Sequence, residues 1–300
     1  MQAFPKTYRL SWAGYEMEFG HRTGIMGVVN VTPDSFSDGG KFLTPESAVA
    51  QGRKLAADGA DILDIGGEST RPFADPVPAD VEIERVIPVI EQLAAEISIP
   101  ISIDTMKSEV ARRAIGAGAS IINDISALRF DPDLGAVAAE FGTPVVLMHM
   151  LGSPRTMQLS PSYTDLIGEI SGFLDAAIVR AQQQGISKSN IILDPGIGFG
   201  KTVSHNLVLL RQIQAFAALD APILVGPSRK SFIRKLLKDE HSDDITPDMP
   251  IVETGTQAAV AAAVLCGAHI VRVHDVASSR ATIRILDAMK AAQKDYTACH

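Results

Sequence analysis

Cysteine is scarce in this chain, which has only Cys266 and Cys299. One lies in an apolar run and the other near the end of the chain, so a framework of disulfides is excluded and a cytoplasmic, reducing location is expected. Long apolar runs are also lacking, since none approaches the roughly 20 residues of a membrane span. The first residues show no basic stretch followed by an apolar one, so we expect neither a membrane anchor nor a signal peptide.

Positively charged side chains are fewer than negatively charged ones. The chain has 27 Lys and Arg against 35 Asp and Glu, a net charge of −8. Nucleic acids and anionic membranes are usually bound by a basic face, so we expect neither as a partner. A few well-placed Arg and Lys side chains can still bind a small anion. Aromatic residues make up only 5% of the chain and hydrophobic residues 46%, so the core should consist mainly of Ala, Val, Ile and Leu.

The sequence shows no internal repeat, low-complexity run or interdomain linker, so we expect a single domain over residues 1–300. Residues 1–22 read as an N-terminal extension. Tyr8–Trp12 and Tyr15–Phe19 alternate between large apolar and polar or small residues, and Ala13-Gly14 supplies a turn between them. This pattern predicts a β-hairpin, which would suit closing the bottom of a barrel.

Beyond the hairpin, short Val/Ile-rich runs alternate with longer stretches of helical periodicity. Runs that are apolar almost throughout are typical of parallel strands covered on both faces. We expect strands near Ile25–Val29, Ile62–Ile65, Ile101–Ile103, Ser120–Ile122, Val145–Met148, Ile191–Leu193, Ile223–Val225 and Ile270–Val273.

The helices between these strands carry start and stop signals. Thr44-Pro45-Glu46 supplies a cap, a first-turn proline and an acidic residue, and Gly59 ends the same helix. Further helices are expected over Asp80–Ile97, with a kink at Pro88, and over Leu166–Gln184, Thr256–Leu265 and the residues after Asp275.

Repeated strand–helix units fit either a closed barrel or an open doubly wound sheet. An open sheet needs polar side chains only at the strands beside its switch point, whereas all eight strand ends of a barrel meet at one mouth. Here every strand ends at or just before a polar residue: Asn30, Asp64, Asp104, Asn123, His149, Asp194, Ser228, and Arg272 with His274. The sequence therefore predicts an α/β fold, a (β/α)8 TIM barrel with an N-terminal β-hairpin, and an active site on the loops that follow the strands.

Several of these loops could bind phosphate. Asn30–Gly40 is long for a strand–helix connection and rich in oxygen-bearing side chains, which suit Mg²⁺ or phosphate, although an ordinary surface loop has the same composition. Gly66–Pro72 combines two glycines, hydroxyls and the planar fork of Arg71, which is equally compatible with a solvated turn. The loops after the last two strands, with Ser228–Ser231 and Arg272-Val-His274, lie where such barrels often bind phosphate.

The segment Asp194–Thr202 is glycine-rich but matches neither nucleotide-binding motif. A Walker A loop would need glycine at Pro195, and the dinucleotide fingerprint would need glycine at Lys201. What remains is a carboxylate at a strand end followed by a flexible turn.

A second group of candidate binding residues consists of Asp104, Asn123, Asp194 and Lys230. Carboxylates accept from N–H and NH₂ groups, an amide offers both a donor and an acceptor, and an ammonium donates to a ring carbonyl or nitrogen. Above an apolar floor, these groups suit a flat heterocycle such as a pterin. We expect that floor to consist of Ile103, Ile122 and Met148.

In combination, these motifs resemble those of the bacterial dihydropteroate synthase family. The resemblance rests on Asn30–Gly40, Gly66–Pro72, Ile103-Asp104-Thr105, the run from Met148 to Gln158, Leu193–Lys201, Ser228–Ser231 and Arg272–Val276, and it extends from about Gly24 to the last helix. It implies a transferase of folate biosynthesis. Such an enzyme condenses 6-hydroxymethyl-7,8-dihydropterin diphosphate with 4-aminobenzoate, giving 7,8-dihydropteroate and diphosphate.

The resemblance also implies roles for single residues. Asn30 would be a ligand of Mg²⁺, and Asp104, Asn123, Asp194 and Lys230 would hold the pterin. Arg272 and His274 would bind diphosphate with help from Thr70 and Arg71, and a homodimer is implied. The catalytic set would be Asp104, Asp194, Lys230, Arg272 and His274, and the residues flanking 4-aminobenzoate would be Pro72, Phe199, Lys230 and Ser231.

Two residues depart from the family pattern, Phe73 where glycine is common and Pro227 where a small or aliphatic residue is usual. Both flank the expected 4-aminobenzoate side. Two other functions remain compatible with parts of the sequence. A pterin-barrel methyltransferase with a corrinoid partner would share the carboxylates but would not need the Arg/His site, and a non-catalytic paralogue should have lost charged loop residues that are all present here.

Overall fold

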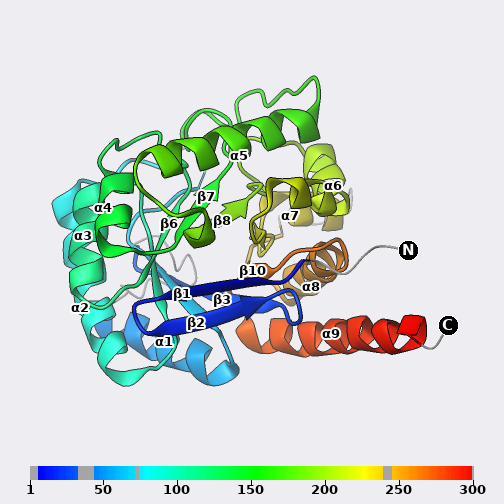
Figure 1. Cartoon of the computed structure of the whole chain (residues 1–300), viewed down its shortest axis with the longest axis horizontal. Helices are drawn as coiled ribbons and strands as arrows, with labels where there is room; N and C mark the ends of the chain where they lie inside the picture. The colour runs from blue at the N-terminus through cyan, green and yellow to red at the C-terminus, as the bar shows by residue number, and fades with distance from the viewer. Residues whose placement is uncertain (1–5, 33–43, 72–73, 239–244, 299–300) are drawn as a thin grey trace.

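The computed structural model describes residues 6–32, 44–71, 74–238 and 245–298. Its centre is a sheet of eight parallel strands with helices around the outside (Figure 1). Each strand pairs with its sequence neighbour from β3 through β8, and β10 lies between β3 and β9. The strands are β3 Gly24–Asn30, β4 Ile62–Gly66, β5 Ile101–Asp104, β6 Ile121–Asp124, β7 Val145–Met148, β8 Ile191–Asp194, β9 Leu224–Val225 and β10 Ile270–Val273.

The two ends of this sheet meet, so the sheet is a barrel. β9 pairs with β10 on one side, and a parallel bridge joins Leu193 of β8 to Ile223 on the other. The amide of Leu193 donates to the carbonyl of Pro222 at 2.9 Å across the same seam. The predicted TIM barrel is therefore confirmed, and the open doubly wound sheet is excluded.

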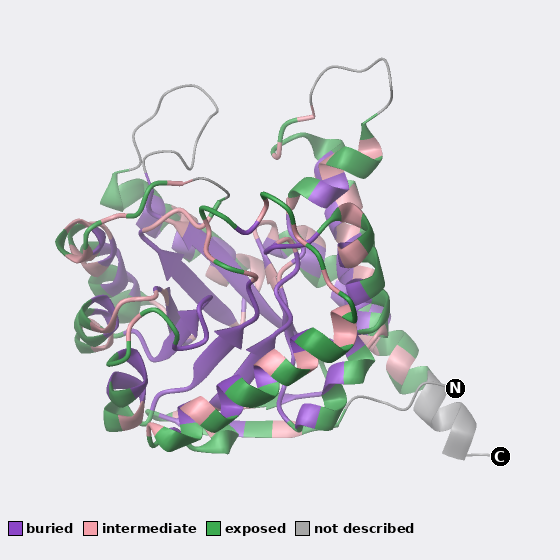
Figure 2. Cartoon of the chain, turned by 90° about the horizontal axis from the view of Figure 1, so that it is seen from above, coloured by how far each residue is buried: buried purple, intermediate pink, exposed green. Residues whose placement is uncertain are grey.

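Helices follow the strands and cover the outside of the barrel, their buried sides facing the strands (Figure 2). The first begins at Pro45 with Thr44 as its N-cap and ends at Gly59, whose φ of 101° gives the left-handed cap expected from the sequence. The helices are α1 Pro45–Asp58, α2 Ala79–Glu96, α3 Ser108–Gly116, α4 Leu134–Phe141, α5 Leu166–Gln183, α6 Val203–Arg211, α7 Ser231–Leu237, α8 Pro250–Leu265 and α9 Val276–Ala298. None of these helices is both long and apolar enough, within the described residues, to cross a membrane.

Several element boundaries differ from the sequence-based expectation, among them those of α8, β6 and β9. α8 begins six positions before Thr256, at Pro250, because a proline at the first helical position is well suited to a helix start. α2 is one helix that contains Pro88, the residue at which a kink is expected. β6 starts one residue later than expected and extends to Asp124, and Ile223 contributes a bridge rather than a strand residue.

The predicted N-terminal hairpin is present, with β1 Tyr8–Trp12 paired antiparallel to β2 Tyr15–Phe19. Its Leu10, Trp12 and Phe19 are buried in one apolar cluster with one residue from each of seven barrel strands: Met26, Ile62, Ile121, Val146, Ile192, Leu224 and Ile270. Strand side chains alternate between the two faces of a sheet, so these residues form one layer inside the barrel. The hairpin closes that layer from the end opposite the strand C-termini.

The larger core lies between the strands and the helices. Its composition bears on the apolar floor that the sequence predicts for the site. Ile103 and Ile122 belong to this outer core, so the prediction that they form the floor under a ring is wrong. Their neighbours Asp104 and Asn123 face the interior, and alternation along a strand sends adjacent side chains to the opposite face. Met148 does lie at the mouth, in a separate cluster with Ile125, Met150, Met157 and Phe199.

Candidate active site

Polar side chains gather inside the barrel at the C-terminal ends of the strands, directly above the apolar layer. Asp64 on β4 and Asn123 on β6 are buried, as is Asp194 at the end of β8. Asp104 ends β5 and Arg272 lies on β10. Several sequence-predicted residues are thus brought together by closure of the barrel.

Arg272 is the centre of this group. Its Nε donates to Oδ2 of Asp64 at 2.6 Å, and its Nη2 donates to Oδ2 of Asp104 at 2.7 Å. Nδ2 of Asn123 donates to the same Oδ2 of Asp64 at 3.0 Å. Two carboxylates therefore share one guanidinium, and one of them also orients the amide of Asn123.

Asp194 is held by the turn that follows it. Its Oδ1 accepts the amide of Gly196 at 2.7 Å. A Cβ on Gly196 would lie 1.9 Å from the carbonyl oxygen of His149, and its φ is +74°, so only glycine fits there. The glycine-rich segment thus supports a carboxylate and does not form a nucleotide loop.

Lys230 and Phe199 meet on the other side of the mouth. Nζ of Lys230 lies 3.9 Å from the centre of the Phe199 ring, a cation–π contact. A Cβ on Gly198 would lie 2.9 Å from Cδ of Lys230, so the turn after β8 also makes room for the lysine stem. Lys230 is the N-cap residue of α7 and Ser231 its first residue.

Cationic side chains surround His274, which follows β10. Nδ1 of His274 lies 2.9 Å from Oγ of Ser228. Burial holds the pKa of His274 well below its ordinary value, and the positive charges of Arg229, Arg272, Lys230 and Arg71 lower it further. His274 is therefore neutral at neutral pH, and this part of the mouth is suited to an anion.

The loop after β4 is anchored by a cluster of ion pairs in which Glu82 is fully buried. The ammonium of Lys107 bridges the carboxylates of Glu68 and Glu82, and Oε1 of Glu68 accepts the amide of Val77 at 3.2 Å. This anchors the base of the loop that carries Thr70 and Arg71. Pro72 and Phe73 lie outside the described residues, as does most of the first loop, residues 33–43.

Lys201 is a buried lysine that the sequence did not single out as a site residue. Its Nζ lies 3.0 Å from Nδ1 of His149 and donates to the carbonyl of Phe199 at 3.0 Å. Burial lowers the pKa of Lys201 to about 7, although the charge of Asp194 opposes that shift. Lys201 thus fixes the backbone beside the Phe199 ring.

Burial also shifts the pKa values of the ring-facing groups. The pKa of Asp194 rises to about 6 because of burial, opposed by the Gly196 amide and by nearby cations. The pKa of Asp104 is raised by burial as well, with Arg272 opposing the rise. The pKa of Lys230 falls to about 8, because burial and the charge of Arg272 disfavour its ammonium form.

Metal ligands are sparse at the mouth. Asn30, the predicted Mg²⁺ ligand, ends β3 and is partly buried. Among the described residues, no group of three or more His, Cys, Asp or Glu side chains could hold a metal ion. A single neutral amide oxygen fits an ion that takes its other ligands from water and substrate phosphates, as Mg²⁺ commonly does.

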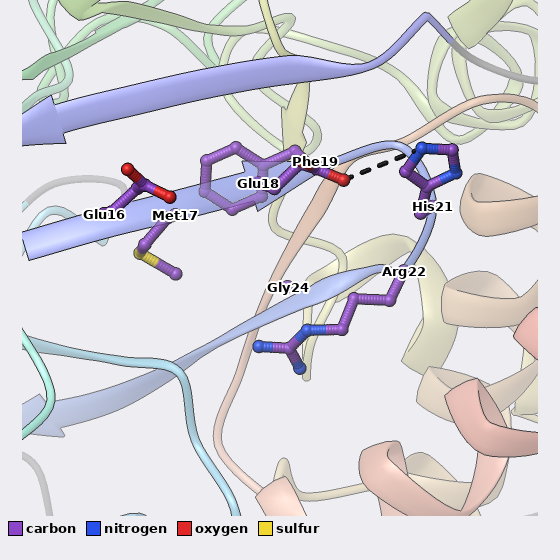
Figure 3. A pocket seen from close by; sticks show the side chains of 7 residues that line it. All are labelled: Glu16, Met17, Glu18, Phe19, His21, Arg22 and Gly24. Carbon is purple, nitrogen blue, oxygen red and sulfur yellow. Dashed lines mark ion pairs between the residues drawn. The ribbon is translucent and has the colours of Figure 1, made fainter.

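Two hollows lie at different places on the molecule. One of about 300 Å³ is lined by Glu16–Phe19 of the hairpin together with His21, Arg22 and Gly24, at the closed end of the barrel (Figure 3). The other, of about 410 Å³, is bounded by the starts of α6 and α7, with Lys201, Ser231 and Gln158 among its lining residues. Only the second adjoins the polar mouth.

Comparisons with known proteins agree with this geometry. Residues 26–274 match the family of pterin binding enzymes. A dihydropteroate synthase of Synechocystis is 48% identical over 272 residues, which cover 91% of this chain and 92% of that protein. The dihydropteroate synthase of Xanthomonas albilineans, solved with 4-aminobenzoic acid, is 44% identical with a TM-score of 0.86, covering 95% of this chain and 99% of the other.

The same Xanthomonas enzyme solved with 7,8-dihydropteroate is 43% identical with a TM-score of 0.83, covering 94% of this chain and 99% of the other. The match spans the whole barrel, including the strand ends that carry the polar mouth. The chain belongs to the pterin-binding enzyme family and, within it, to the dihydropteroate synthases.

Proposed function

We propose that the mouth of the barrel joins 6-hydroxymethyl-7,8-dihydropterin diphosphate to 4-aminobenzoate, with the described residues in the roles given below. The chain is a dihydropteroate synthase, a transferase. The observation that carries the assignment of roles is the division of the mouth into two zones. Two carboxylates and an amide (Asp104, Asn123, Asp194), of which Asn123 and Asp194 are buried, lie beside a cluster of cations around His274.

The first zone suits the dihydropterin ring. Asp104 and Asp194 can accept from its N–H and NH₂ groups, Asn123 can pair with an edge that has both a donor and an acceptor, and Lys230 can donate to a ring oxygen or nitrogen. Charge-assisted hydrogen bonds of this kind are stronger than neutral ones. Burial makes each of these groups costly to leave unpaired, which favours a ring that satisfies them all.

The second zone suits the diphosphate. In the reaction, the bond between the methylene carbon and the diphosphate oxygen breaks, and the electron pair leaves with diphosphate. Arg71, Arg272 and His274 stabilise the charge that grows on the leaving group, with Thr70 as a further donor. Asp104 and Asp194 favour positive charge delocalised on the ring. The amine of 4-aminobenzoate then forms the carbon–nitrogen bond and releases a proton to solvent.

The second substrate would bind beside Phe199. Its weakly basic amine attacks in the neutral form, so no strong general base is required. Phe199 supplies an apolar wall backed by Met148, Met150 and Met157, and Ser231 at the start of α7 lies at the adjoining hollow. Lys230 and Pro72 complete this subsite in the proposal. The Xanthomonas enzyme, 44% identical to this chain, was solved with 4-aminobenzoic acid, which supports that compound as the second substrate.

The cofactor in this proposal is Mg²⁺, held by Asn30 and by oxygens of the substrate and water. When bound, the ion would supply further positive charge at the diphosphate. Asn30 lies at the same end of the barrel as Asp104, because β3 and β5 flank β4 and Asn30 and Asp104 both pair with Gly66.

Incubating the purified chain with Mg²⁺ and both substrates tests the proposal, with mass spectrometry to detect the product. We expect 7,8-dihydropteroate and diphosphate in equal amounts. Omitting 4-aminobenzoate should abolish the new mass. A chain that binds the pterin but forms no dihydropteroate would instead support a non-catalytic role, and methyl transfer from methyltetrahydrofolate to a corrinoid would support the methyltransferase.

We also propose that the enzyme is a homodimer in the cytoplasm. Large apolar side chains are exposed on the adjoining helices α6, α7 and α8: Leu207, Val208, Leu236, Ile251 and Leu265. Apolar surface on neighbouring elements is typical of a subunit interface. Light scattering should give twice the monomer mass of 31.9 kDa. The small number of cysteines is consistent with a reducing compartment.

A further inference from the structure

We propose that Asp64 is the positioning residue of the pterin subsite, since it fixes which edge of Asn123 and which face of Arg272 the substrate meets. This inference rests on the function proposed above. Asp64 lies on β4, where its side chain is fully buried, and it does not itself touch the substrate in the proposal. It acts through the two side chains that its carboxylate holds.

The amide of Asn123 has two possible orientations, and Asp64 selects one. An ionised carboxylate can only accept, so it must face Nδ2 of Asn123, which lies 3.0 Å away. This leaves Oδ1 of Asn123 and its second N–H hydrogen to meet the ring. Without the carboxylate, both orientations of the Asn123 amide would be populated. Fixing one of them on binding would then reduce the binding free energy of the pterin.

Arg272 is fixed by the same oxygen. Its Nε donates to Oδ2 of Asp64 while its Nη2 reaches Asp104, so the plane of the guanidinium is defined at two points. A planar group held at two points loses little further freedom on meeting a ligand. Asp64 therefore keeps Arg272 from rotating onto Asp104 alone and leaves Asp104 available to the ring.

A purely structural role for Asp64 fits the contacts less well. Its other oxygen, Oδ1, is buried with no hydrogen-bond partner among the described residues. A carboxylate retained for stability alone would be expected to satisfy both oxygens, since an unpaired buried acceptor costs free energy. Within the described part of the chain, the engaged oxygen accepts hydrogen bonds from two side chains, and both belong to the candidate site.

The test compares three variants with the native enzyme. Asp64→Asn keeps the shape but removes the charge, and Asp64→Leu removes the acceptor. Asp61→Asn is the matched control, because Asp61 lies just before the same strand, at its opposite end, and pairs with Arg22. We expect calorimetry with the pterin diphosphate to show roughly 10-fold weaker binding for Asp64→Asn and a larger loss for Asp64→Leu, with little change for the control.

A pH profile separates positioning from stability. Burial, Asp64 and Glu82 raise the pKa of Asp104, whereas Arg272 and Lys230 lower it. Removing the charge of Asp64 should therefore lower the pKa of Asp104, and the acid limb of pterin binding should move to lower pH even though binding at neutral pH is weaker. The KM for 4-aminobenzoate at saturating pterin diphosphate should stay near the native value. A variant that is only less stable would show neither pattern.

The outcomes are distinct. If the native chain forms no dihydropteroate, the proposed function fails. If the native chain is active but Asp64→Asn matches Asp61→Asn in pterin affinity and pH profile, the positioning role is overturned. Should the Asp64 variants not fold, a crystal structure of the native enzyme with a bound pterin decides. Asn123 still hydrogen-bonded to Asp64 supports the role, and Asn123 turned away from it overturns it.

Discussion

The ammonium of Lys230 lies over the face of the Phe199 ring, with Nζ 3.9 Å from the ring centre. The same ammonium is close enough to Asp104 and Asp194 for their charges to affect its pKa. One side chain thus connects the acidic zone of the mouth to the aromatic wall beside it. A substitution or ligand on one side of Lys230 should therefore affect ligand binding on the other side.

Phe199→Leu should weaken 4-aminobenzoate binding more than pterin binding. The substitution keeps an apolar side chain but removes an aromatic face, and such a face contributes about 1 kcal/mol beyond simple burial. We expect the KM for 4-aminobenzoate to rise roughly 5-fold. Phe141→Leu is the control, because Phe141 also has a cation over its ring, Arg112 at 5.6 Å, but is exposed on α4. Equal KM values for the two variants would remove Phe199 from the subsite.

Asp194→Asn should cost more in pterin affinity than in folding. The swap is nearly isosteric, but it replaces an ionised acceptor with a neutral amide. Hydrogen bonds to charged groups contribute about 1.5–3 kcal/mol, so binding should weaken roughly 10- to 100-fold. Calorimetry with the pterin diphosphate measures this, with Asp175→Asn on the exposed side of α5 as the control. Native affinity in Asp194→Asn would contradict a ring-binding role.

The pH dependence of kcat/KM for the pterin diphosphate should form a narrow bell. Asp104 and Asp194 must both be ionised to accept from the ring. Burial raises the pKa of both carboxyls, that of Asp194 to about 6, so the acid limb lies well above that of an ordinary carboxyl. Lys230 must be protonated to donate, and its pKa of about 8 places the alkaline limb below that of an ordinary lysine. Binding of a pterin without diphosphate should show the same two limbs, which excludes phosphate ionisation as their source. Pterin binding that does not change between about pH 5 and 9 would contradict this assignment, because an ordinary carboxyl titrates below that range and an ordinary lysine above it.

Asn30→Ala should raise the Mg²⁺ concentration needed for half-maximal rate. Asn30 would be one of few protein ligands, so the loss should be partial and should be recovered at high Mg²⁺. Rate measured against Mg²⁺ concentration tests this, and thermal unfolding without the metal checks that the fold is unchanged. Unchanged metal dependence would remove Asn30 from the metal site.

Local signals predicted the secondary structure well. The cap at Thr44 and the left-handed Gly59 depend on residues within one turn of each other, so the ends of α1 are readable from the sequence. The start of α8 was placed too late, because Met249 offers no side-chain cap and the signal from Pro250 is weak on its own. Alternation along the strands would have placed Ile103 and Ile122 outside the barrel.

Local sequence patterns could not predict which side chains of the site contact one another. Asp64 is separated by 59 positions from Asn123 and by 208 from Arg272, yet one oxygen binds both. The sequence identified all three as polar residues at strand ends. It could not show which of them bind each other, because that depends on how the closed barrel sets the height of each strand relative to the next.

The last prediction is ordered binding, with 4-aminobenzoate after the pterin diphosphate. Without ligand, the Lys230 ammonium covers the face of Phe199 that would meet the benzoate ring. A pterin that accepts a hydrogen bond from Lys230 would draw the ammonium off that face, so the first ligand lowers the cost of binding the second. Couplings of this kind commonly change affinity roughly 5- to 150-fold. Calorimetry with 4-aminobenzoate, first alone and then with Mg²⁺, diphosphate and a pterin present, measures the coupling. Lys230→Ala should reduce it, because the ring face is then already free. Equal affinity under both conditions in the native enzyme would mean that the second subsite is preformed, and the order would have no structural basis.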